Sequence, residues 1–175
     1  MRNRSWSRWR NCLLLRHLRK FDGLWLLGRV GWYIKSKSPL IIFDGVCNLC
    51  NASVQFIVKR DKQGIFKFAS AQSEIGEEIL SRFEIATTEP ESVFLLQNNT
   101  LIKKSSAALA IAAELDGFWK YLALLRFIPR PVRDFVYDWI ARNRYRWFGK
   151  REECMLPTEA TRKRFLDNSL FEQSS

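Results

Sequence analysis

The chain has 175 residues and a formal net charge of +11, from 29 Lys and Arg against 18 Asp and Glu, and 47% of its residues are hydrophobic. This length suits one domain with a sizeable core, and the composition excludes a collagen-like, low-complexity or wholly disordered chain. Charged residues interrupt every apolar stretch before it reaches the roughly 18 residues that a membrane span needs.

The positive charge is concentrated in residues 1–38, which hold ten Lys or Arg and one acid. We predict that they form a basic N-terminal extension, whose Arg and Trp residues are a candidate for peripheral contact with an anionic membrane. Membrane contact is not the favoured interpretation, because no apolar stripe runs through the segment. We favour a presequence, an upstream start site, or a helix that packs on the domain through Leu24, Trp25 and Leu27. The remaining residues are nearly neutral, which argues against nucleic-acid binding.

The predicted domain, residues 39–156, begins after a polar stretch that ends at Pro39. The apolar run Leu40–Phe43 is typical of a strand buried on both faces. A helix is predicted from Cys47 to about Arg60, where apolar residues recur at helical spacing. Cys47 and Cys50 are therefore expected where a strand gives way to a helix.

A second strand is predicted at Ile65–Phe68, and Ser73 is expected to cap a helix that continues to about Phe83. Two further strands, Ser92–Leu96 and Thr100–Lys103, should pair as a hairpin through a three-residue connection. A strand–helix–strand–helix order followed by a hairpin indicates an α/β fold with a mixed sheet covered by helices.

The rest of the chain is predicted to be mainly helical. Ser105 or Ser106 should cap an Ala- and Leu-rich helix that ends at Gly117, and Pro131 suits the first turn of the last helix. One face of that last helix carries the apolar residues Val132, Phe135, Val136, Trp139 and Ile140, together with Asn143. We expect Arg142, Arg144 and Arg146 to form its solvated face, and residues 157–175 to form a C-terminal tail.

The pair Cys47 and Cys50 has the spacing of a redox motif. A cysteine at a helix N-terminus faces unpaired N–H groups and the positive end of the helix dipole, which favour the reactive thiolate. Cys50, one helical turn later, is near enough to attack a mixed disulfide formed at Cys47. This interpretation requires two sulfurs that are open to solvent and within bonding reach of each other.

Two other readings of these cysteines stay open. A zinc site would need further ligands, for which the chain offers Cys12, His17 and Cys154. Alternatively, both thiols are buried and have no chemical role. Four unevenly spaced cysteines do not make the disulfide framework of a small secreted domain, and the start of the chain has no secretory signal, so the predicted compartment is the cytoplasm.

The segment Phe43–Cys50, with the sequence FDGVCNLC, resembles the opening motif of the DCC family, named for one Asp and two Cys. The segment Ala141–Gly149, followed by Cys154, resembles the closing segment of that family. The resemblance implies a thioredoxin-like fold and thiol–disulfide oxidoreductase activity. It places Asp44, Cys47 and Cys50 at the signature positions of the family and does not extend to residues 1–38.

The role of Asp44 is open, because it could accept a proton from Cys50 or brace the loop by binding its backbone amides. The dipeptide Asn48–Leu49 between the cysteines does not indicate whether the redox potential of the pair is that of a reductant or an oxidant. Pro90 is the candidate for the cis-proline that thioredoxin-like folds usually carry, although an ordinary turn proline is the preferred interpretation.

Two hydrolytic classes are disfavoured. An Asp nucleophile of the haloacid-dehalogenase type needs a second Asp two residues later, where this chain has Val46. A Cys–His hydrolase would have to use His17, the one histidine, which lies in the basic extension.

The sequence therefore predicts a thiol–disulfide oxidoreductase that uses Cys47 and Cys50, with Asp44 beside them, on a protein disulfide or small thiol substrate. No cofactor and no metal is expected. The alternative is a non-catalytic binding module of the same fold, whose thiols are structural or bind a metal.

Overall fold

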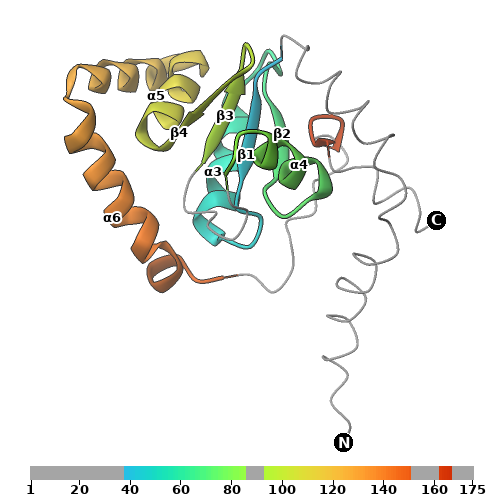
Figure 1. The fold of residues 1–175 in the computed structure, drawn as a ribbon. Coiled ribbons are helices and arrows are strands. Elements are labelled where there is room, and N and C mark those ends of the chain that lie inside the picture. The colour runs from blue at the N-terminus through green and yellow to red at the C-terminus, as the bar shows by residue number, and fades with distance from the viewer. Residues whose placement is uncertain (1–37, 86–92, 151–161, 167–175) are drawn as a thin grey trace, which may run out of the picture. The chain divides into compact units, whose positions relative to one another are not determined.

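The computed structural model describes residues 38–85, 93–150 and 162–166 (Figure 1). The chain divides into two units, Met1–Lys35 and Ser36–Ser175, and all of the described residues belong to the second. The predicted extension, including Cys12 and His17, lies outside the described residues, as do Pro90 and Cys154. The predicted domain boundaries stay predictions.

Four short strands form one mixed sheet in the order β2-β1-β3-β4. Its strands are β1 (Leu40–Phe43), β2 (Lys67–Ser70), β3 (Phe94–Gln97) and β4 (Thr100–Lys103). The central strand β1 runs parallel to β2 and antiparallel to β3, and β3 runs antiparallel to β4. All four residues of β1 are buried, which confirms the prediction of a strand covered on both faces.

Helices cover the sheet and extend beyond it (Figure 1). They are α3 (Asn48–Arg60), α4 (Glu74–Arg82), α5 (Lys104–Glu114), the 3-10 helix η1 (Gly117–Phe127) and α6 (Arg130–Phe148). Helix α4 contacts β2, α5 contacts both strands of the hairpin, and α6 contacts α3 and α5. The predicted fold class is confirmed: a thioredoxin-like mixed sheet is flanked by helices and followed by a helical C-terminal extension.

The core lies between the sheet and helices α3 and α5. Ile41 is the register partner of both Phe68 and Leu95, so the three side chains share one face of the sheet. They pack with apolar residues of α3 and α5, and Cys47 and Cys50 belong to the same cluster. The two cysteines are therefore attached to the most rigid part of the domain.

The second strand is displaced by two residues from its predicted position. It was expected at Ile65–Phe68, but it spans Lys67–Ser70. The reason is that the carboxylate of Asp61 accepts hydrogen bonds from the backbone amides of Ile65 and Phe66, at 3.1 and 3.0 Å. A side chain thus takes the amides that a longer strand would have paired.

The hairpin exists, but its connection has two residues where three were expected. Asn98 and Asn99 have φ values of 49° and 62°, the left-handed conformation that a tight primed turn requires and that Asn tolerates. The predicted serine cap of α5 is wrong. Helix α5 begins at Lys104, and the hydroxyl of Ser105 donates instead to the carboxylate of Asp134 on α6.

Other predictions about the helices are confirmed. Ser73 caps α4 by accepting a hydrogen bond from the amide of Gly76, and Pro131 stands in the first turn of α6. Phe165, in the segment predicted as a tail, is buried against Phe43 and Phe68. Among the described residues, no helix is long and apolar enough to cross a membrane.

Candidate active site

The two cysteines lie where the sequence predicts them, at the junction of β1 and α3. Cys47 is the N-cap residue of α3, with an extended backbone, and Cys50 lies in the first turn of the helix. Their side chains hydrogen-bond to each other, and neither thiol is in a disulfide. The two thiols are therefore neighbours at the start of the helix.

The two thiols differ in access to solvent. Cys47 has no exposed surface, whereas Cys50 is 7% exposed and lines a pocket. Both thiols are nevertheless buried, so the requirement that the two sulfurs be open to solvent is not met in this conformation. Any reaction at Cys47 needs a local movement of the groups that cover it.

The thiol of Cys50 has a raised pKa. Burial raises the pKa of Cys50 to about 12, and the neighbouring Cys47 adds to this rise, while the positive charge of Arg144 opposes it. Cys50 therefore keeps its proton at neutral pH and can donate it to the sulfur of Cys47. A protonated Cys50 is a poor nucleophile until it loses its proton.

Asp44 follows β1 directly and is buried, with 1% of its surface exposed. One carboxylate oxygen accepts hydrogen bonds from the amide of Val46 and from the side chain of Gln72, at 3.2 and 2.8 Å. The other accepts from Arg144 at 2.8 Å and from the hydroxyl of Tyr145. Asp44 thus braces the loop before Cys47, and both of its oxygens are occupied.

The partners of Asp44 come from distant parts of the chain. Arg144 and Tyr145 lie on α6, one hundred residues later in the sequence. Burial and the hydrogen bond to Asp44 raise the pKa of Tyr145 to about 12, so its hydroxyl remains a donor. Gln72 also accepts from the amide of Gly45 at 2.9 Å, which ties the loops after β1 and β2 together.

The prediction that Arg144 lies on a solvated face is wrong, because its side chain is buried against Asp44. Arg142 and Arg146 are exposed, as predicted. Periodicity did not indicate that Arg144 and Tyr145 belong to the site. The one signal in the sequence was that both residues lie in the segment that resembles the closing motif of the DCC family.

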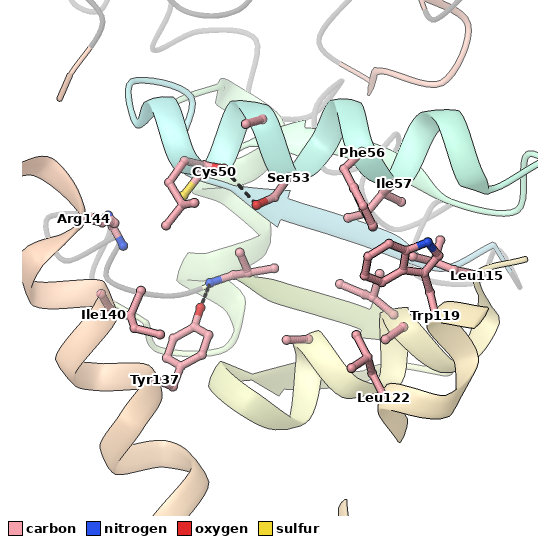
Figure 2. Close-up of a pocket in the computed structure, with 17 residues that line it drawn as sticks. Cys50, Ser53, Phe56, Ile57, Leu115, Trp119, Leu122, Tyr137, Ile140 and Arg144 are labelled. Atoms are coloured by element: carbon pink, nitrogen blue, oxygen red, sulfur yellow. Dashed lines mark hydrogen bonds between the residues drawn. The ribbon is translucent and has the colours of Figure 1, made fainter. Parts of the chain in front are cut away.

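A pocket of about 530 Å³ lies beside Cys50 (Figure 2). It is enclosed by α3, α5, η1 and α6, and its lining is mainly apolar, with Phe56 and Trp119 in edge-to-face contact. Cys50 and Arg144 are at one end of the pocket and Trp119 is at the other. Leu122 and Ile140 line it and are also partly exposed, so the pocket is open to solvent.

The end of α6 and the residues after it cover Cys47. The side-chain amide of Asn48 donates to the backbone carbonyl of Phe148 at 2.8 Å, and Cys47 forms a β-bridge with Lys150. Gly149, between them, has a φ of +75° and approaches Asn48 closely. Because Phe148–Lys150 contacts both Cys47 and Asn48, movement of this segment would change the access of solvent to Cys47.

We expect the Asn48→Ala variant to expose Cys47 more often than the parent. Loss of one hydrogen bond of about 1 kcal/mol raises the open population roughly fivefold, so alkylation of Cys47 by iodoacetamide, followed by mass spectrometry, should accelerate by that factor. Asn143→Ala is the matched control, because it removes another 2.8 Å bond from an amide to a carbonyl on α6. Equal alkylation rates in the two variants would contradict the covering role.

The structure describes no group of three or more His, Cys, Asp or Glu residues that could hold a metal. The other ligands considered for a zinc site, Cys12, His17 and Cys154, lie outside the described residues. The described site therefore offers two thiols, a buried ion pair and an apolar pocket.

Comparisons with known proteins agree with the motifs. The family model described as DCC1-like thiol-disulfide oxidoreductase matches residues 41–150. The uncharacterized protein YuxK of Bacillus subtilis is 46% identical over 127 residues, which cover 73% of this chain and 93% of that protein. A chloroplastic DCC family protein of Arabidopsis thaliana is 37% identical over 142 residues, covering 81% of this chain and 83% of its own length.

No solved structure matches the chain. The family model covers the sheet, both cysteines and the Asp44–Arg144 pair, which are the parts that build the site. The chain belongs to the DCC1-like thiol-disulfide oxidoreductase family.

Proposed function

We propose that this protein is an enzyme that catalyses thiol–disulfide exchange, with Cys47 as the attacking sulfur and Cys50 as the resolving sulfur. The observation that carries the proposal is the contact between the two thiols at the start of α3, in which Cys50 has a pKa of about 12. A protonated Cys50 stabilises negative charge on Cys47 by donating to it, and the helix N-terminus acts in the same direction.

The proposed cycle balances without a cofactor. The Cys47 thiolate attacks one sulfur of a substrate disulfide, the substrate S–S bond breaks, and one substrate thiolate leaves. Cys50 then passes its proton to the substrate thiolate that left first and attacks the Cys47 sulfur, which breaks the mixed disulfide and releases the second substrate thiolate. Two electrons pass to the substrate, and the Cys47–Cys50 disulfide remains.

In this proposal Asp44 is a positioning residue. It lies at the signature position of the family, but both of its oxygens already accept hydrogen bonds. It therefore supports the loop that presents Cys47 and anchors Arg144 beside Cys50. Arg144 lowers the pKa of Cys50, which helps the second step of the cycle.

The substrate is a protein disulfide or a small disulfide. The pocket beside Cys50 supports a substrate that carries an apolar group next to its sulfur, because the lining residues leave few polar partners. We propose the cytoplasm as the compartment. There the glutathione and thioredoxin systems would hold the resting enzyme in its dithiol form.

A redox titration tests the proposed function. The Cys12→Ser/Cys154→Ser variant leaves Cys47 and Cys50 as the remaining thiols, and it is equilibrated with mixtures of reduced and oxidised glutathione. We expect two thiols to disappear together as one reversible intramolecular disulfide forms. Thiols that persist in the most oxidising mixture, or that form glutathione adducts without closing the disulfide, would refute the proposal.

The complete burial of Cys47 favours a second function, a binding module of the same fold whose thiols are structural or hold a metal. The same titration separates the two, since structural thiols stay unreactive until the protein unfolds. Metal analysis of the full chain adds a further distinction. The second function predicts either unreactive thiols or a bound metal, and the first predicts neither.

A further inference from the structure

Helix α6 carries its apolar stripe on the side that faces solvent. Phe135 is 70% exposed, and Val132, Val136 and Trp139 are also exposed. A helix on the surface of a domain ordinarily turns such a stripe toward the core. The arrangement in α6 is the reverse, so this exposed stripe is not what attaches the helix to the domain.

Polar side chains make that attachment instead. Asp134 accepts a hydrogen bond from Ser105, and Asp138 accepts one from Lys104 at 2.7 Å, so both acids are bonded to the start of α5. Arg144 is buried against Asp44 in the site. Specific polar bonds therefore hold α6 in place, and the described residues leave its apolar stripe uncovered.

The uncovered surface continues along the neighbouring 3-10 helix. All of the exposed large hydrophobic side chains that the structure describes fall between Phe118 and Phe148, and Phe127 is 81% exposed. We name this surface the apolar face of η1 and α6. Exposed apolar surface on this scale marks a site of interaction with a protein or a membrane.

The charges on this surface have one sign. Gly117–Lys150 is described throughout, and its two acids, Asp134 and Asp138, are the ones bonded to α5. Both acids are only partly buried, but each is bonded to α5, whereas several basic residues are exposed. The exposed basic residues include Lys120, Arg126, Arg130, Arg142 and Arg146.

This combination selects one kind of occupant. A symmetric dimer through the same surface would bring the basic side chains of two copies together, which disfavours self-association. A nucleic acid would neutralise the charge but would leave the exposed phenylalanines without an apolar partner. An anionic bilayer supplies both a layer of phosphates for the basic residues and an apolar layer for the hydrophobic ones.

We propose that the apolar face of η1 and α6 docks this protein on an anionic lipid membrane. Helix α6 lies along the interface, with Val132, Phe135 and Trp139 at the boundary between headgroups and acyl chains. Arg142 and Arg146 contact lipid phosphates. The proposal concerns attachment and does not depend on the thiol chemistry.

Co-sedimentation of the full chain with lipid vesicles tests it. We expect binding to vesicles of mixed phosphatidylglycerol and phosphatidylcholine, and little binding to phosphatidylcholine alone. The Val132→Gln/Phe135→Gln variant replaces two exposed apolar residues with good helix formers, and it should bind about tenfold more weakly because less apolar surface enters the membrane. If this variant bound the vesicles as tightly as the parent, the proposal would be overturned. Residues outside the apolar face of η1 and α6 would then account for the vesicle binding.

A charge-matched pair of variants separates a specific surface from general attraction. Arg142→Gln/Arg146→Gln removes two exposed charges from α6, and Lys59→Gln/Arg82→Gln removes two exposed charges from α3 and α4. Each basic residue near an anionic surface contributes roughly a fivefold factor in binding, so the first variant should lose far more affinity than the second. Equal losses, or dimerisation of the parent without vesicle binding in analytical ultracentrifugation, would overturn the proposal.

Discussion

The Cys47→Ser variant is expected to lose disulfide exchange, while Cys50→Ser should accumulate a long-lived mixed disulfide with its substrate. Serine at position 47 removes the sulfur that begins the proposed cycle, so the exchange rate should fall by at least roughly a thousandfold. Serine at position 50 leaves that sulfur in place but removes the group that releases the adduct.

The order of the two roles rests on acidity as well as position. Cys50 has a pKa of about 12, first because it is buried and then because Cys47 lies beside it. In Cys47→Ser the burial remains, so Cys50 stays protonated at neutral pH and attacks a disulfide poorly. We therefore expect Cys50 alone not to replace Cys47, although it is the more exposed thiol.

The measurement uses the Cys12→Ser/Cys154→Ser background, so that other thiols contribute nothing. A disulfide-containing peptide with an apolar residue beside its cysteine serves as substrate, and intact mass spectrometry follows both reduction of the peptide and adduct formation. Long-lived adducts on Cys50 in the Cys47→Ser variant, together with loss of exchange without adducts in Cys50→Ser, would reverse the assigned roles. Parental exchange in both variants would remove the two cysteines from the mechanism.

The local part of the site could be predicted from sequence because its determinants are adjacent in the chain. An apolar run followed by Asp44 and Gly45 ends a buried strand, and helical spacing begins at Cys47. These short-range signals placed the two thiols at a strand–helix junction. The displaced second strand was missed because Asp61 takes its first two amides, and a side-chain bond of that kind leaves no periodic pattern.

The long-range part of the site could not be derived from periodicity. Arg144 alternates with two exposed arginines, Arg142 and Arg146, and all three look like a solvated face. What buries the middle one is a carboxylate one hundred residues earlier in the chain. The amphipathic pattern of α6 was also visible in the sequence. Such a pattern shows that one side of the helix is apolar, but it does not show whether that side faces the core or the solvent.

We expect the Arg144→Met variant to lower the free energy of unfolding by about 3–5 kcal/mol, because it leaves a buried carboxylate without its cation. Asp44 is 1% exposed and cannot recover hydration in the folded state. The hydrogen bonds from Val46, Gln72 and Tyr145 satisfy its oxygens but do not neutralise its charge. Urea unfolding, followed by far-ultraviolet circular dichroism, measures the loss.

Two further variants make this result specific to the buried pair. Arg142→Met removes an exposed arginine from the same helix and should change stability by less than about 0.5 kcal/mol. The double variant Asp44→Asn/Arg144→Met removes both charges and should be more stable than Arg144→Met alone, because no uncompensated charge stays buried. If Arg144→Met costs no more than Arg142→Met, the pair does not hold α6 against the loop of Cys47. The covering of Cys47 would then need a different explanation.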